Sequence, residues 1–485
     1  MANPAAHHGN LWWRVRIFTI AFALVADSCK LALGMTKILA CTAPVHGHLY
    51  PIAPVLAELV SRGHEVTALT LPGVEEDLAP LGIRTLELPP EVVGRRLDGW
   101  GDRARILALR ADVHALIERI PAEIEALRAA IIAERPQALL LDITAVGAHI
   151  YAATSGLPWA AFAPKLLPLP SRDSPPYGPG LIPKPGPLGG IRDRAVRWAL
   201  SRRWDNALPR LNHLRQYYGL DELDHCVDCL RQPPLLLNFT APPFEDAHTD
   251  WPASVHQIGP SLWSPDAEIP DWLAEIDRPL AVVTCSTEFQ DDGRLAQLAM
   301  DALADSDLFT VVTSGAIDPE FFAAPRNAKV VRFLPHHLLL PRAAVVVTHG
   351  GMGITQKALA AGVPVCVVPF GRGQAEVARR VVGNGAGSRV CKQRLRIATL
   401  RAGIDAARAC AAGAEQVAAG FLAAGGPRRG ADLLEQHFTP PPPRRARTRP
   451  QRHLDRRRRP PLIAPAEPTP LVGLSDDAGL TELGQ

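Results

Sequence analysis

Apolar and polar positions alternate along the chain in a repeated order of strand, loop and helix. From residue 37 the apolar KILACT is followed by the polar loop APVHGHLYP, by IAPVLAELVSRG with apolar residues at helical spacing, and by HEVTALT. The same alternation reaches ALLLD at residues 138–142. Strands that alternate with helices predict an α/β fold, in which helices cover a parallel sheet.

A second run of alternating segments begins after residue 265. PLAVVTCS, a helix near 291–304, LFTVVTSG, AKVVRFLP, AAVVVTHGG and VPVCVVPFG follow one another in order. This run predicts a second doubly wound, Rossmann-like domain over residues 266–437, joined by a linker over 246–265 to a first domain over 35–245.

Three segments depart from this pattern. Residues 164–190 are rich in Pro and Gly and too long for a simple connection; loops of this kind are usually functional lids or disordered, and we expect a lid over the acceptor. Residues 1–34 hold the apolar run IFTIAFALVA, too short to span a bilayer; we interpret them as a dispensable leader or mis-assigned extension before Met35, with a membrane-tethering leader as the alternative. We expect the Pro/Arg-rich tail over 438–485 to be disordered and solvated, with binding to RNA or anionic lipid as its alternative.

The distribution of charge argues against a nucleic-acid partner. The chain has 52 basic and 49 acidic residues, a net charge of +3. Residues 1–34 carry +2 and residues 439–485 carry +4, which leaves about −3 for the span between them. A nucleic-acid-binding protein needs a basic face on its folded part. We therefore expect any bound anion to be held by backbone N–H groups and a helix dipole.

The cysteines indicate a reducing compartment, and we expect a cytoplasmic protein. Eight cysteines are scattered, mostly in apolar runs. Cys226 and Cys229 have the spacing of a zinc knuckle, but no second pair follows to complete four ligands. We therefore expect no structural zinc site.

A glycine-rich turn precedes a predicted helix at THGGMG. His349, Gly350, Gly351 and Gly353 follow a hydrophobic strand. Glycines allow close approach of a ligand to the backbone, and the N-terminus of a helix binds diphosphate. The turn has neither the lysine of a P-loop nor the full dinucleotide fingerprint, and glycines at such turns also serve packing alone.

Two further polar residues follow strands of the first domain. His48 precedes the first helix, and Asp142 ends the strand ALLLD. Because the carboxyl ends of parallel strands face one crevice, Asp142 can orient His48 as a base that accepts a proton from a hydroxyl. Taken separately, His48 can be an ordinary histidine at a helix start and Asp142 a helix cap.

Together, GHLYP, FLPHHLLLP, THGGMG and PFGRGQ resemble the family 1 glycosyltransferases of GT-B fold, over about residues 36–437. The resemblance implies two facing Rossmann-like domains, an acceptor site in the first, a nucleotide-sugar site in the second, and inversion at the anomeric carbon. It implies no obligatory metal or other cofactor, since the nucleotide-sugar is a co-substrate. A hydrophobic hydroxyl-bearing acceptor and peripheral membrane contact are the expected partners.

The resemblance also assigns roles to individual residues. His48 is the catalytic base and Asp142 its orienting acid. The expected donor-binding residues are Ser286, Thr287, Phe333, His336, His349, Gly350, Gly351, Gly353, Thr355 and Gln374. Among them, Phe333 stacks on the nucleobase and His349 contacts the diphosphate.

Three positions depart from the family pattern. Ile354 replaces a hydroxyl residue, and Lys357 replaces a ribose-binding Glu. Gly373 replaces the Asp of an Asp-Gln pair that holds sugar hydroxyls, a loss of about 1.5 to 3 kcal/mol if nothing substitutes. The prediction is therefore an inverting glycosyltransferase that acts on a hydrophobic small molecule or lipid. The alternatives are a nucleotide-sugar-binding protein or weakened enzyme, and a nucleotide-sugar epimerase of the same fold.

Overall fold

The chain forms two parallel sheets with helices on both faces. The computed structural model describes residues 35–94, 105–286, 292–371 and 373–439, which belong to one compact unit. All strand pairings are parallel. The α/β prediction is thus confirmed. The predicted leader and nearly all of the predicted disordered tail lie outside the described residues.

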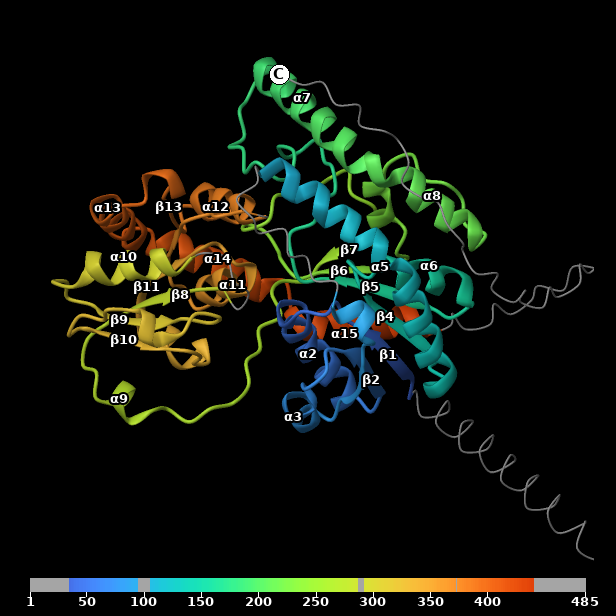
Figure 1. Ribbon diagram of the computed structural model, residues 1–485, viewed down its shortest axis with the longest axis horizontal. Coiled ribbons are helices and arrows are strands. Elements are labelled where there is room, and N and C mark those ends of the chain that lie inside the picture. The colour runs from blue at the N-terminus through green and yellow to red at the C-terminus, as the bar shows by residue number, and fades with distance from the viewer. Residues whose placement is uncertain (1–34, 95–104, 287–291, 372, 440–485) are drawn as a thin grey trace, which may run out of the picture. The chain divides into compact units, whose positions relative to one another are not determined.

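The first sheet has seven strands in the order β3-β2-β1-β4-β5-β6-β7 (Figure 1). The strands are β1 (Lys37–Cys41), β2 (Glu65–Thr70), β3 (Arg84–Glu87), β4 (Ala138–Asp142), β5 (Trp159–Ala163), β6 (Leu236–Asn238) and β7 (Val255–Gln257). The helices between them are α2 (His46–Ser61), α3 (Glu75–Leu78), α4 (Pro90–Val93), α5 (Arg105–Glu134), α6 (Val146–Ser155), α7 (Pro187–Trp204) and α8 (Leu208–Tyr217).

Alternate residues of β4 supply the two faces of this sheet. Leu140 lies in a core with residues of α2, and Leu139 and Leu141 lie in a second core with residues of α5 and α6. All five β4 residues are buried, as the continuous apolar run of a central parallel strand predicts. Asp142 is therefore placed at the carboxyl end of a fully buried strand.

The second sheet has six strands in the order β10-β9-β8-β11-β12-β13. They are β8 (Leu280–Thr284), β9 (Phe309–Thr313), β10 (Ala328–Val331), β11 (Ala343–Thr348), β12 (Val365–Val367) and β13 (Gly387–Arg389). The helices are α9 (Asp271–Ala274), α10 (Gly293–Leu303), α11 (Met352–Ala360), α12 (Gln374–Gly383), α13 (Ile397–Arg408), α14 (Ala411–Ala423) and α15 (Gly426–Phe438). Residues of α11, α12 and α14 share one core, and residues of α10 and α13 share the other.

Two elements lie outside the sequence pattern of their own sheet. Strand β7 falls inside the stretch that we predict as linker, yet it pairs with β6. Helix α15 ends the second run, but its Leu434 is part of the core of the first sheet, and α15 packs against α2. The domain boundaries remain a prediction, and these contacts show where segments cross between the two sheets.

Candidate active site

The side chains of His48 and Asp142 form a hydrogen-bonded pair at the ends of β1 and β4. Helix α2 begins after a short loop that follows β1, and it carries His48 in its first turn. His48 Nδ1 lies 2.8 Å from Asp142 Oδ2, although the two residues are 94 positions apart. The Asp142 side chain is fully buried, whereas that of His48 is 18% exposed. The structure therefore brings together the two residues that sequence reasoning pairs.

The surroundings of Asp142 determine which nitrogen of His48 carries the proton. Asp142 Oδ1 accepts hydrogen bonds from Thr144 N at 2.8 Å and Thr144 Oγ1 at 2.6 Å. Burial opposes ionisation, but the charge and hydrogen bond of His48 and the bonds from Thr144 hold the pKa of Asp142 well below its usual range. An ionised carboxylate only accepts hydrogen bonds, so Nδ1 donates and Nε2 has the free lone pair of a base.

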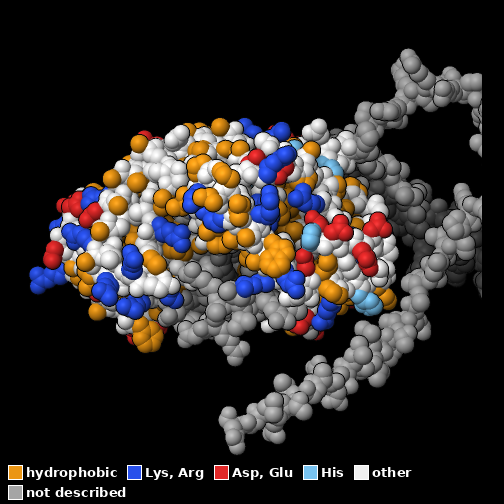
Figure 2. Space-filling model, turned by 90° about the horizontal axis from the view of Figure 1, so that it is seen from above, with side chains coloured by type: hydrophobic (Ala, Val, Ile, Leu, Met, Phe, Trp, Pro, Cys, Tyr) orange, Lys and Arg blue, Asp and Glu red, His pale blue; other side chains and the backbone are white. Residues whose placement is uncertain are grey.

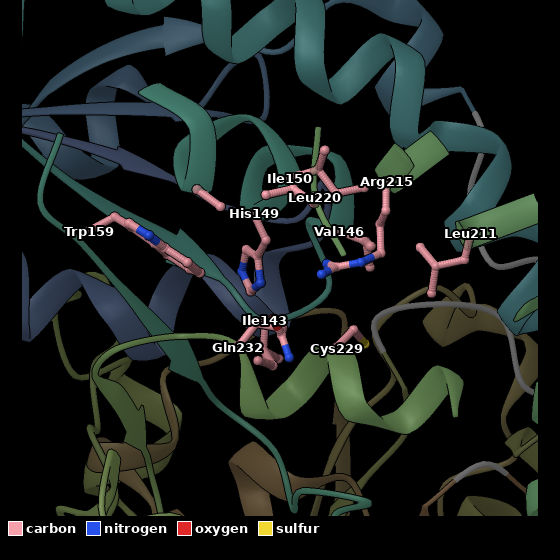
Figure 3. A pocket seen from close by; sticks show the side chains of 11 residues that line it. Ile143, Val146, His149, Ile150, Trp159, Leu211, Arg215, Leu220, Cys229 and Gln232 are labelled. Atoms are coloured by element: carbon pink, nitrogen blue, oxygen red, sulfur yellow. The ribbon is translucent and has the colours of Figure 1, made fainter. Parts of the chain in front are cut away.

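The main chain of Asp142 is fixed from another side by His149. His149 Nε2 donates to the carbonyl oxygen of Asp142 at 3.0 Å. Burial lowers the pKa of His149 to about 4, so the ring is neutral. His149 also lines a cavity of about 70 Å³, into which Figure 3 shows its ring and the Arg215 guanidinium both pointing. Thr144 holds the carboxylate of Asp142 and His149 holds its carbonyl, so the group that orients His48 is fixed at both ends.

The expected diphosphate site is formed by the turn between β11 and α11. Gly351 is the N-cap of α11, and the first turn of that helix directs its backbone N–H groups outward. His349 is buried, with Nδ1 3.3 Å from Asp292 Oδ2. A Cβ at Gly351 would lie 2.8 Å from His349 Nε2, so this glycine leaves the space that the ring occupies. Helix dipole and imidazole therefore face the same place, as an anion site requires.

The other expected donor-binding residues differ from one another in burial and in their contacts. Ser286 follows β8, and its backbone N–H donates to Asp292 Oδ2 at 2.7 Å. Phe333 is 61% exposed, as a ring that stacks on a ligand must be. His336 Nε2 lies 3.3 Å from Thr313 Oγ1, and burial, followed by nearby Lys357, lowers its pKa to about 3.

The structure does not place Thr355 or Thr287 at the expected donor-binding surface. The buried Thr355 hydroxyl donates to the Gly351 carbonyl at 2.8 Å within α11, so its geometry speaks against a contact with phosphate. Thr287 lies outside the described residues.

Gly350 has a φ of +97° and lies next to Gln374. A Cβ added at Gly350 would lie 3.2 Å from the Cβ of Gln374. Gly350 therefore allows the turn before α11 to approach the first residue of α12 closely.

Gly373, the strongest departure from the family pattern, has its side-chain space filled by Tyr177. A Cβ at Gly373 would lie 2.4 Å from the Tyr177 hydroxyl oxygen. The neighbouring Gln374 accepts hydrogen bonds at Oε1 from the backbone N–H groups of Phe370 and Gly371, at 2.7 and 2.9 Å. The missing Asp side chain is therefore replaced in space by a phenol from the loop predicted as a lid.

This loop is anchored on α12 by a buried carboxylate. Glu376 Oε1 accepts hydrogen bonds from Gly178 N and Gly180 N, both at 2.8 Å, and Glu376 Oε2 accepts one from Arg380 at 3.0 Å. Arg380 also pairs with the buried Glu245. Gly180 has a φ of +64°, and a Cβ added there would lie 2.2 Å from the carbonyl oxygen of Ala375, so the close approach needs a glycine. Tyr177 is thus held at Gly373 by its neighbours.

Lys357 and the cysteine pair Cys226 and Cys229 are held in buried surroundings. Lys357 donates to Ser264 Oγ at 2.6 Å, and burial lowers its pKa to about 8. Burial likewise raises the pKa values of Cys226 and Cys229 to about 12, and both side chains pack in an apolar cluster with residues of α5, α6 and α8. Among the described residues, no group of three or more His, Cys, Asp and Glu side chains could hold a metal ion.

Sequence reasoning misses Thr144, Asp292 and Tyr177. Thr144 has a recognisable signal, because a hydroxyl residue two positions after an Asp commonly caps that carboxylate. Asp292 precedes the first turn of α10 and resembles an ordinary helix start. Tyr177 lies in a Pro-rich segment without periodicity, so nothing in the sequence predicts its contact with Gly373.

A histidine-carboxylate pair at the end of one parallel sheet and a glycine-rich helix start in a second define a two-sheet transferase of the GT-B class. Solved structures agree on the fold. The calicheamicin glycosyltransferase has 21% identity, covers 83% of this chain and 98% of its own, and gives a TM-score of 0.63. The glycosyltransferase VinC in complex with dTDP also has 21% identity, with 83% and 99% coverage and a TM-score of 0.62.

Sequence comparison gives the family. Residues 297–436 match the family described as erythromycin biosynthesis protein CIII-like, C-terminal domain. The 4'-demethylrebeccamycin synthase of Lentzea aerocolonigenes is 34% identical over 403 residues, which cover 76% of this chain and 91% of that protein. The chain belongs to the family 1 natural-product glycosyltransferases, and it is a glycosyltransferase enzyme.

Proposed function

We propose that this enzyme transfers a hexose-type sugar, with inversion, from a dTDP- or UDP-sugar to a hydroxyl of a hydrophobic small molecule or lipid. The observation that carries the proposal is the hydrogen bond from His48 Nδ1 to the ionised Asp142. The dTDP bound by the related VinC supports the donor class. The synthase of 4'-demethylrebeccamycin supports a natural-product acceptor. The cytoplasm is the proposed compartment.

The proposed reaction is a single displacement. His48 Nε2 accepts the proton of the acceptor hydroxyl as its oxygen attacks the anomeric carbon, and the bond from that carbon to the nucleotide diphosphate breaks. Asp142 stabilises the imidazolium that forms. The N-terminus of α11 and His349 stabilise the negative charge of the departing diphosphate. We propose that no resident metal or other cofactor takes part. We therefore expect a chelator of divalent metals to leave the turnover rate unchanged.

His48→Ala tests the proposal, and His46→Ala is its matched control. His46 is an exposed histidine two residues earlier on the same helix. Loss of a general base lowers turnover by about 10² to 10⁴-fold. We expect that loss for His48→Ala with dTDP affinity unchanged, and wild-type turnover for His46→Ala. Equal turnover in the two variants contradicts the base assignment.

A donor-only reaction separates the alternatives. An epimerase converts the nucleotide-sugar without an acceptor, whereas the proposed transferase releases nucleotide in proportion to acceptor. Nucleotide release and sugar products are followed by chromatography with and without acceptor. Conversion of the donor sugar in the absence of acceptor supports the epimerase instead.

A further inference from the structure

Helix α7 presents an apolar face that no other described element covers. Leu188, Ile191 and Trp198 are 68%, 62% and 65% exposed. Their spacing of three and seven residues places them on one side of the helix, together with the exposed Ala195. Ile182, 67% exposed, precedes the helix. Single exposed apolar residues are ordinary, but a row of large ones along one helix face marks an interaction surface.

The opposite side of α7 is half-buried and makes contacts with the preceding loop. Arg197 donates to the carbonyl of Ser171 at 2.6 Å, and Arg192 donates to the carbonyl of Ile182 at 3.0 Å. Leu200 and Trp204 line a cavity with prolines of the loop below. These contacts place the half-buried side of α7 against the loop, and the apolar row faces outward.

Unpaired cations border the apolar row. Lys184, Arg194 and Arg202 are exposed, and none of them forms an ion pair with a described residue. The Arg202 guanidinium lies 5.7 Å from the centre of the Trp198 ring. Asp193, the acidic residue of α7, pairs with Arg192. Figure 2 looks down on the side that carries α7 in Figure 1 and shows hydrophobic side chains interleaved with Lys and Arg.

We propose that this face, Ile182, Lys184, Leu188, Ile191, Arg194, Trp198 and Arg202, docks the enzyme on an anionic lipid surface. Trp, Leu and Ile insert at the boundary of headgroups and acyl chains, while Lys and Arg remain at the level of the anionic headgroups. The charges decide between this occupant and a second copy of the chain. A two-fold contact sets the same patch against itself and would bring these cations together without an acid between them.

The surface lies over the loop predicted as a lid. Arg197 of α7 binds the Ser171 carbonyl of this loop, and Tyr177 of the same loop contacts Gly373. Docking would therefore hold the lid region close to the lipid layer, where a hydrophobic acceptor concentrates. This consequence rests on the proposed function, whereas docking itself does not.

Vesicle co-sedimentation of the full-length chain tests the proposal. We expect binding to vesicles of equal parts phosphatidylcholine and phosphatidylglycerol, little binding to phosphatidylcholine alone, and weaker binding at high salt. Ile191→Ser with Trp198→Ser should weaken partitioning about tenfold, through lost insertion. Arg194→Gln with Arg202→Gln should weaken it by about as much on anionic vesicles. Leu422→Ser, at an 84% exposed leucine of α14, is the matched control and should change nothing.

Each alternative gives a distinct result. Leader and tail are present in every variant, so wild-type binding by both α7 variants would assign membrane contact to those segments and overturn the proposal. Equal binding to both vesicle types would overturn the recognition of anionic lipid. A dimer in lipid-free sedimentation that the double serine variant dissociates would identify the face as a contact between copies. Turnover with a water-soluble acceptor should be unchanged in the double serine variant, which separates this test from that of the proposed function.

Discussion

Gly373→Ala should destabilise the enzyme through one contact. The added Cβ would lie 2.4 Å from the Tyr177 hydroxyl oxygen, about 1 Å inside an ordinary van der Waals contact. The next atom, Tyr177 Cζ, would lie at 3.5 Å, which is an ordinary distance. Gly373 has φ −75° and ψ 4°, a conformation open to alanine, so backbone strain does not contribute. The phenolic oxygen is therefore the whole obstacle.

The loop cannot withdraw without losing other contacts. Gly178 N and Gly180 N both donate to the Glu376 carboxylate, and moving Tyr177 away pulls on both bonds. Overpacking of this kind costs about 1 to 3 kcal/mol of unfolding free energy. In a Tyr177→Phe background the offending oxygen is absent, so the cost of Gly373→Ala should fall to within about 0.5 kcal/mol of zero.

Urea unfolding of the four proteins of this double-mutant cycle measures the coupling. Gly383→Ala is the control, because Gly383 ends the same helix and an added Cβ meets nothing within 4 Å. The control should be neutral or more stable by up to about 1 kcal/mol. An equal cost of Gly373→Ala with and without the Tyr177 hydroxyl would refute the reasoning, as would wild-type stability of Gly373→Ala itself.

Three further predictions concern the supports of the site. Thr144→Val removes the 2.6 Å hydrogen bond to Asp142 Oδ1, so the carboxylate is held less firmly toward His48 and turnover should fall about three- to tenfold; wild-type turnover contradicts this. Burial lowers the pKa of His149 to about 4, so the unfolded chain binds more protons, and unfolding free energy should fall by about 3 kcal/mol between pH 6.5 and 4. His149→Gln should flatten that part of the pH dependence in urea unfolding, and parallel curves would contradict it. Asp292→Asn weakens the support of His349 and of the Ser286 N–H, so calorimetry should show about tenfold weaker dTDP binding, with His46→Ala unaffected.

The pairing of His48 with Asp142 follows from sequence because sheet topology alone brings strand ends together. Asp142 ends one strongly apolar strand and His48 lies in the first helical turn after another, and carboxyl ends of neighbouring parallel strands must share an edge. The glycine turn before α11 is predictable for the same reason. Phe333, which follows β10, is likewise placed with an exposed ring.

Contacts between segments without periodicity could not be predicted. Tyr177 reaches Gly373 from a Pro-rich loop whose path depends on the Glu376 carboxylate, 198 and 196 residues from the N–H groups it binds. Strand β7 has three residues, too few to show alternation. The family resemblance assigns Thr355 to the donor site, but a serine or threonine inside a helix readily donates to the carbonyl four residues earlier, as Thr355 does.

The return of α15 to the first sheet constrains how such enzymes can be recombined. Leu433, Leu434 and Phe438 complete the core beneath α2, although they are synthesised last among the described residues. During translation the core of the first sheet stays incomplete until these residues are synthesised. A fragment of half the length therefore exposes the apolar surface that they cover. A chimera that exchanges donor specificity therefore needs two junctions, one near residue 260 and one near Gly425, with α15 retained from the parent of the first sheet.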